Sequence, residues 1–220
     1  MPIYVAPGSG TPIESAPGAA PPMLTSLGIN QVSQRPQANW CWAACTVMVA
    51  RYLRATDPDM PGGQPTMCHL AGLIHNQPTC CADPSVCDDG AWPEPAYAHL
   101  GITIDADVPS PPSNSERVLA LDEIRHEITA RRRPIEVLYK WNTHGAHVVL
   151  ITGVYDNGQL EVLDPWFGTE SPVSYDYVRT ARGLGRWAGT YSGFNLRPPG
   201  APHADTPAAS VERDTYVAST

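Results

Sequence analysis

Positive charge is scarce in this sequence of 220 residues. Fourteen Lys and Arg residues stand against 22 Asp and Glu residues, so the formal net charge is −8, and charged residues make up only 16% of the chain. Proteins that bind nucleic acid neutralise phosphates with clustered Lys and Arg. The acidic balance therefore argues against a nucleic-acid partner.

Long apolar runs are lacking as well. No stretch approaches the ~20 apolar residues that cross a bilayer, so we expect no membrane span. The N-terminus has neither the basic nor the apolar segment of a cleavable secretory signal. Six cysteines nevertheless favour an oxidising compartment, since four of them crowd residues 68–87. Localisation stays open: export by a route without a cleavable signal peptide would reconcile these clues, and the cytoplasm is the alternative.

Proline and glycine are abundant, with 24 and 18 residues, and much of the excess lies at the two ends of the chain. Residues 1–28 and 197–220 carry little apolar periodicity, which is typical of disordered arms. We therefore predict a single domain over residues 29–196, between an N-terminal arm and a C-terminal tail.

The first half of this domain has helical signals. The string WCWAACTVMVARYL places apolar residues at i, i+3 and i+4, and Pro36 and Asn39 precede it as start signals. Two further helices are predicted at Met67–His75 and Glu116–Arg131, the second after a loop at Ser110–Ser115.

The second half has strand signals. His147–Tyr155 is nearly all apolar, as in a buried central strand, and Asp156-Asn157-Gly158 is a strong hairpin turn. Other strands are predicted at Pro134–Tyr139, Gln159–Leu163 and Trp187–Phe194. Helices followed by an antiparallel sheet indicate an α+β domain.

Cys41 is a candidate nucleophile because it lies where the first helix should begin. The free N–H groups of a helix N-terminus favour a thiolate over a thiol, and the thiolate is the reactive form. Buried, unreactive cysteines are common, so position alone does not establish this role.

A base and its orienting partner are available in the sheet. His147 opens the apolar strand and Asp164 ends the returning one, so the two side chains become neighbours if a bulge near Gly153 or a longer first strand corrects the register. A carboxylate beside the imidazole would fix its tautomer, completing a nucleophile–base–orienter set. His144, in a polar loop without an apolar strand behind it, is the competing base.

Three blocks in the order expected, QANWCWAAC, GAHVVLITGVY and LEVLDPWFG, resemble the papain superfamily over about residues 31–192. Cys41-Trp42 matches its Cys-Trp at a helix start, His147 its histidine before a strand, and Asp164 the place where papain itself has Asn. The closest likeness is to compact bacterial members, the effector and staphopain-like proteases.

The resemblance implies a papain-like fold, in which an N-terminal helical part bearing the nucleophile helix packs against the antiparallel sheet. It implies a cysteine peptidase that cleaves peptide or isopeptide bonds of a protein or peptide substrate through a thioester acyl-enzyme, with no cofactor and no metal. The family's oxyanion donor is a Gln: Gln37 is the first candidate and Gln34 the alternative. A transglutaminase-like transferase or deamidase, and a non-catalytic binding module, stay open as other functions.

The remaining cysteines suggest disulfides. Adjacent cysteines form a strained ring when bonded, so Cys80 and Cys81 need different partners. With Cys41 set aside, five cysteines remain, so one of them is unpaired or pairs between chains. Free thiols and a structural zinc are the alternatives, the zinc ligands being Cys68, Cys81, Cys87 and either His69 or Cys80.

Overall fold

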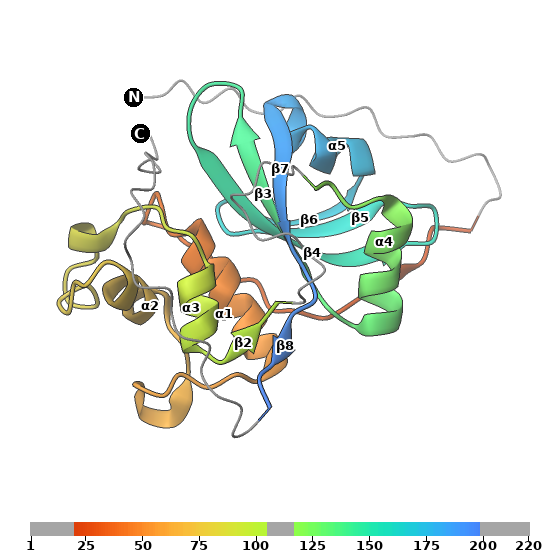
Figure 1. Ribbon diagram of the computed structural model, residues 1–220. Helices are drawn as coiled ribbons and strands as arrows, with labels where there is room; N and C mark the ends of the chain where they lie inside the picture. The colour runs from red at the N-terminus through yellow and green to blue at the C-terminus, as the bar shows by residue number, and fades with distance from the viewer. Residues whose placement is uncertain (1–19, 105–116, 199–220) are drawn as a thin grey trace.

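A computed structural model describes residues 20–104 and 117–198 of the chain. Helices α1–α3 gather on one side of the molecule, and a twisted sheet with α4 and α5 forms the other (Figure 1). The predicted α+β order, helices first and antiparallel sheet second, is confirmed.

The helical side confirms the two helices predicted there and adds one. The elements are α1 (Cys41–Leu53), η1 (Pro61–Gly63), α2 (Met67–Ile74), η2 (Pro84–Cys87) and α3 (Glu94–His99). Across the described ranges, no helix combines the length and apolarity needed to cross a bilayer.

The sheet has the strand order β6-β5-β4-β3-β7, with β1 beside β4 as well. Its strands are β1 (Leu24–Ser26), β3 (Ile135–Trp141), β4 (Ala146–Tyr155), β5 (Leu160–Asp164), β6 (Gly168–Val173) and β7 (Gly185–Tyr191). A separate pair joins β2 (Ile102–Thr103) to β8 (Asn195–Leu196), and the short elements α5 (Tyr175–Arg179) and η4 (Ala181–Gly183) connect β6 to β7.

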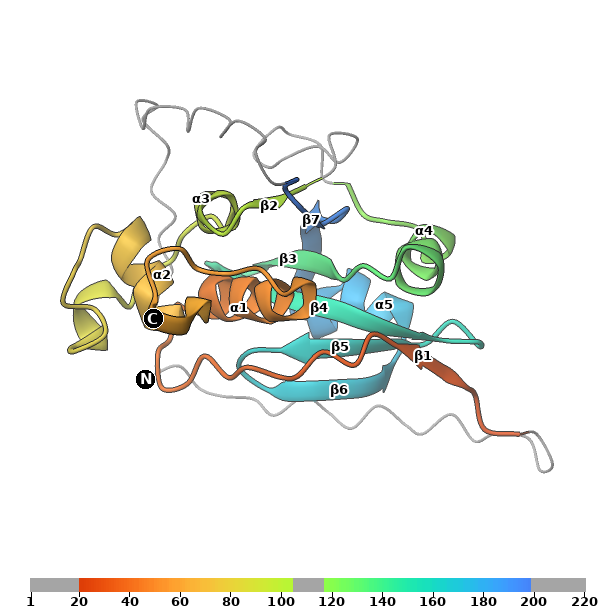
Figure 2. The same ribbon diagram turned by 90° about the horizontal axis from the view of Figure 1, so that it is seen from below.

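Strand β4 is the centre of the fold and confirms the buried-strand prediction. Only its two end residues are partly exposed. Val148 and Leu150 pack in one core with α1, while Val149 and Ile151 pack in a second core with α4 and α5. Figure 2 shows α1 lying along this strand. The alternation of side chains along β4 therefore supplies both cores.

Of the two register corrections expected from the sequence, the bulge is present in the β4–β5 pairing. The register shifts between Ile151 and Gly153, where Ile151 pairs with Val162 and Gly153 with Glu161. Gly153 suits this position because a Cβ built there would come within 2.8 Å of the Leu24 side chain. With this shift, His147 at the start of β4 lies beside Asp164 at the end of β5.

The helix predicted at Glu116–Arg131 begins later than expected. Helix α4 spans Leu121–Arg125 and continues as a π-helical segment, η3, over His126–Arg131. Ala120 is extended, and its N–H donates to the Glu123 carboxylate at 2.8 Å, which caps the helix there. Residue 116 and the predicted loop Ser110–Ser115 lie outside the described residues.

The predicted boundary of the N-terminal arm at residue 28 is wrong, because part of that arm belongs to the sheet. Strand β1 pairs with Gly153–Tyr155, and the Ser26 hydroxyl donates to Glu161 at 2.6 Å. Leu27 is buried, and its N–H donates to the Thr152 carbonyl. Residues 1–19 of the arm and 199–220 of the tail lie outside the described residues.

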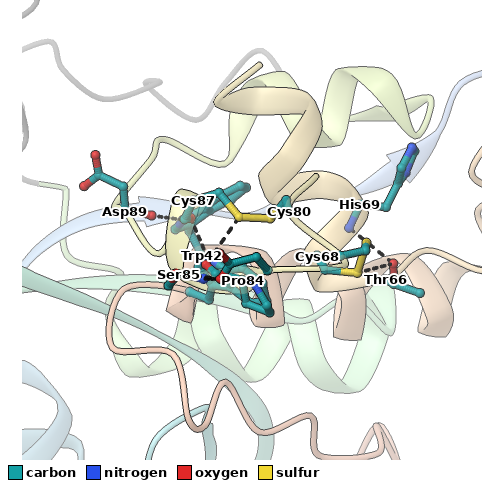
Figure 3. The surroundings of a disulfide bond; sticks show 12 residues. Trp42, Thr66, Cys68, His69, Cys80, Pro84, Ser85, Cys87 and Asp89 are labelled. Carbon is teal, nitrogen blue, oxygen red and sulfur yellow. Dashed lines mark hydrogen bonds between the residues drawn. A yellow bond between two sulfur atoms is a disulfide. The ribbon is translucent and has the colours of Figure 1, made fainter. Parts of the chain in front are cut away.

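Two disulfides close the loop-rich region between α2 and α3, as predicted. They join Cys68 to Cys81 and Cys80 to Cys87, so the adjacent cysteines do take different partners. The Cys80–Cys87 bond lies beside Trp42 of α1 (Figure 3). The zinc alternative built on these cysteines is therefore wrong.

Candidate active site

Cys41 is the first residue of α1, and its side chain is almost entirely buried. The preceding residue, Trp40, makes no capping hydrogen bond with its side chain. The N–H groups of the first helical turn are therefore not capped by the Trp40 side chain, and Cys41 lies at the helix start that the sequence predicted.

The loop before Cys41 is held by Asp88. Its two carboxylate oxygens accept from the Ala38 N–H at 2.9 Å and the Asn39 N–H at 2.8 Å, and its carbonyl accepts from the Asn39 amide. The indole N–H groups of Trp40 and Trp42 donate to the carbonyls on either side of Asp88. A segment that follows the Cys80–Cys87 disulfide thus positions the start of α1.

His147 lies at the start of β4 and is held on two sides. Its Nε2 lies 2.9 Å from Asp164 Oδ1, at the end of β5, and its ring stacks on Trp141 with 6.0 Å between centroids. With Nε2 engaged, Nδ1 is the nitrogen available to a thiol. The Cys41 side chain is close enough to affect the titration of this ring.

The environment of His147 favours its protonated form. Burial lowers the pKa of the ring, but the charge and hydrogen bond of Asp164, followed by the Cys41 side chain, outweigh burial and raise the pKa to about 10. An imidazolium therefore persists at neutral pH, as a cysteine–histidine ion pair requires.

Asp164 is a fully buried carboxylate with a donor on every side. Oδ1 accepts from His147 and from the Trp166 and Phe167 N–H groups at 2.7 and 3.0 Å, while Oδ2 accepts from Arg182 at 2.6 Å. Burial would raise the pKa of Asp164, but His147, Arg182 and the Trp166 N–H hold it below its usual range. Asp164 is thus kept ionised beside the imidazole.

Arg182 is a part of the site that was not expected from the sequence. Its side chain is 3% exposed, bridges Asp164 and Glu170 at 2.6 Å each, and lies 4.0 Å from the Phe167 ring centroid. It comes from η4 with a left-handed φ of 64°. Nothing in its local sequence, ARGLG, distinguishes it from the other arginines, so no signal could have found it.

The two glutamine candidates are placed differently. Gln34 is 1% exposed and lines a pocket with His147 and Trp166, whereas Gln37 is partly exposed and is not part of that lining. Gln34 Nε2 donates to the Gln37 and Ala38 carbonyls, and the Gln34 N–H donates to the Pro165 carbonyl. The geometry therefore favours Gln34, the alternative candidate, over Gln37.

The pocket beside His147 lies between the loop preceding α1 and the sheet. Its lining also includes His144, whose side chain is exposed. The contact with Asp164 is made by His147, so His144 is a wall of the pocket. Cys41 itself lines a separate, largely apolar recess together with Trp92, Leu138 and Tyr191.

Cys45 provides a contrast to Cys41 within the same helix. It is fully buried one turn further on, and its thiol lies 3.5 Å from the Val148 carbonyl. Burial, and next the nearby Glu136, raise the pKa of Cys45 well above its usual value. This thiol is therefore held in its unreactive form.

Comparison with known proteins supports a protease. The family model described as papain-like cysteine protease AvrRpt2 matches residues 25–180, which include α1, β4, β5 and every residue that lines the pocket beside His147. No curated protein matches the chain. The matched range begins within β1, in agreement with the corrected boundary of the domain.

Proposed function

The chain belongs to the family of the papain-like cysteine protease AvrRpt2, and we propose that Cys41, His147 and Asp164 form its catalytic triad. The papain-like resemblance drawn from the sequence is thereby confirmed at the level of the family. The observation that carries the triad is the 2.9 Å contact between His147 and Asp164, next to a thiol at a helix start.

In this proposal the Cys41 thiolate attacks the carbonyl carbon of a peptide bond in a protein substrate. His147, protonated at neutral pH, transfers its proton to the departing amine, leaving a thioester on Cys41. Water then attacks the thioester carbon and gives one proton to His147; the C–S bond breaks, the acyl group leaves as a carboxylic acid, and the Cys41 thiolate is restored. The raised pKa of His147 supports its role as the acid of the first step.

Asp164 orients the ring in this scheme. It holds Nε2, so Nδ1 faces the thiol, and its charge stabilises the imidazolium in both steps. Two backbone N–H groups hold the Asp164 carboxylate in place, which maintains its contact with His147 during turnover.

We assign the oxyanion donors to the Cys41 backbone N–H and the Gln34 side chain. Gln34 lines the pocket. One of its amide N–H groups, which now donates to a backbone carbonyl, would donate instead to the developing oxyanion. Removing one such donor costs about 10²–10³ in kcat. Gln34→Ala should show a loss of this size while Gln37→Ala stays near the unsubstituted protein, and equal losses would contradict the assignment.

The experiment for the triad is product analysis by mass spectrometry after incubation with an unbiased peptide library. Cys41→Ala should lower cleavage at least about 10³-fold. Cys45→Ala is the matched control, because it removes a thiol of the same helix and should leave the chemical step intact. Full activity in Cys41→Ala would refute the nucleophile, and an amine-incorporation assay run in parallel separates hydrolysis from transfer.

A further inference from the structure

Three metal-ligating side chains meet within the helical half of the molecule. Asp57 lies in the loop after α1, His69 in the first turn of α2, and His99 at the end of α3. Their ligand atoms all lie within 4.8 Å of one another. Three segments far apart in the sequence therefore converge on one point.

The contacts in this cluster centre on the Asp57 carboxylate. Its Oδ2 lies 2.7 Å from His69 Nδ1, and its Oδ1 lies 3.0 Å from His99 Nε2. A second carboxylate, that of Asp59, lies 3.8 Å from the same His99 nitrogen. Two imidazoles and two carboxylates are thus within reach of a common centre.

We propose that Asp57, His69, His99 and Asp59 bind one zinc ion. Nitrogen and oxygen donors of this kind suit zinc, whereas calcium and magnesium take oxygen ligands. Zinc has no redox chemistry of its own, so it is compatible with the two disulfides in the same part of the chain.

The distances are close to those of a tetrahedral site. Zinc bonds of about 2.0–2.1 Å place neighbouring ligand atoms ~3.4 Å apart. The contacts of 2.7 and 3.0 Å use different oxygens of Asp57, and the Asp59 contact is 3.8 Å. One ligand atom from each of Asp57, His69 and His99 lies within 4.8 Å of the others, so the cluster brackets the expected value. Shifts of less than ~1 Å would therefore replace the hydrogen bonds of Asp57 with metal bonds.

Burial and charge suit an ion as well. The Asp57 side chain is fully buried, while those of His69 and His99 are 24% and 15% exposed and that of Asp59 is 60% exposed. The site thus has a buried anchor and an open side through which an ion can enter. The carboxylates of Asp57 and Asp59 supply oxygen donors of negative charge for a divalent cation.

The site is separate from the disulfides. Figure 3 shows the His69 side chain directed away from the Cys80–Cys87 bond, although His69 follows Cys68 in α2. From the sequence, His69 was a candidate zinc ligand only in company with cysteines, and the structure pairs those cysteines with each other. The proposed ion would instead join the end of the nucleophile helix to α2 and α3, and it does not depend on the proposed triad.

The test is a calorimetric titration of the full-length Cys41→Ala protein, free of any tag, with zinc alone. The Cys41→Ala background removes the one other thiol–imidazole pair that we expect to capture zinc. We expect one ion per chain, and a rise in the melting temperature of about 5–10 °C at a zinc concentration 100 times the Kd. His69→Gln and His99→Gln should each weaken binding about 100-fold or more, since even outer partners of a ligand contribute 10–100-fold.

His126→Gln is the matched control, because His126 is exposed on η3 and should bind no zinc. Equal affinity in His69→Gln and His126→Gln, or no zinc binding at all, would overturn the proposal. Either ligand variant could unfold, so the unmodified ligand set is also titrated with Co²⁺. A tetrahedral spectrum without a thiolate charge-transfer band supports the site, and a spectrum with that band, or none, contradicts it.

Discussion

Replacing Asp164 with asparagine should move the alkaline limit of activity toward neutral pH. The pKa of His147 stands at about 10 against an ordinary 6.5, and the causes that raise it are led by Asp164. This difference corresponds to about 5 kcal/mol of stabilisation of the imidazolium, at about 1.4 kcal/mol for each pH unit. Asparagine keeps an acceptor for the ring and for the backbone N–H groups but removes the charge.

The sign follows from the proton that His147 must carry. A raised pKa preserves the imidazolium up to about pH 10, so kcat/KM should hold through neutral pH and fall as the pH passes that value. An opposite charge at close range contributes about 1–3 pH units. Because the contact between His147 and Asp164 is buried and only 2.9 Å long, we expect the alkaline limit of kcat/KM to lie about 2–3 pH units lower in Asp164→Asn.

The assay is kcat/KM from pH 5 to 11 with a peptide substrate found in the library experiment. Asp176→Asn is the control, since Asp176 is an exposed carboxylate paired with Arg179. Asp164→Ala should be less active than Asp164→Asn, because it also leaves the Trp166 and Phe167 N–H groups without their acceptor. An alkaline limb that stays in place in Asp164→Asn would refute the claim that the Asp164 charge holds the proton on His147.

Two other variants test contacts that hold the site from a distance. Asp88→Ala removes the acceptor of two backbone N–H groups just before the nucleophile, so kcat/KM should fall about 10–100-fold, given about 1.5–3 kcal/mol for a hydrogen bond to a charged group. Asp89→Ala, the exposed neighbour, should change little, and equal effects of the two would contradict the anchoring role. Arg182→Met should lower the free energy of unfolding by about 3–5 kcal/mol in urea, because it leaves buried carboxylates without their cation. Arg179→Met breaks an exposed ion pair and should cost less than about 1 kcal/mol, so a similar cost for both would refute the argument.

The elements that carry the proposed triad were predictable because their signals are local. Cys41 begins a strongly periodic helix, and His147 and Asp164 flank a continuous apolar strand and its hairpin. Counting residues between the two side chains also indicated a register correction, with a bulge near Gly153 as one of two possibilities. Periodicity and turn chemistry were sufficient at these places.

The supports of the site were not predictable, because they act across the fold. Asp88 reaches residues about 50 positions earlier, and Arg182 reaches Asp164 from a short connection with no regular pattern. The choice between Gln34 and Gln37 depended on a loop whose course is set by contacts with Pro165. Strand β1 was hidden in a Pro- and Gly-rich segment, since three residues are too few to show alternation.

The two disulfides present different obstacles to a reducing agent. Cys81 is exposed, whereas Cys80 and Cys87 are 1% and 2% exposed, and the exchange reaction requires a thiolate to approach one sulfur in line with the bond. A small thiol that keeps Cys41 reduced therefore meets the Cys68–Cys81 bond first. The Cys80–Cys87 bond, which directly precedes Asp88, is reduced only if its loop moves away from the core. A mild reductant can therefore open the Cys68–Cys81 bond while the Cys80–Cys87 bond stays intact, because access decides which of the two bonds reacts.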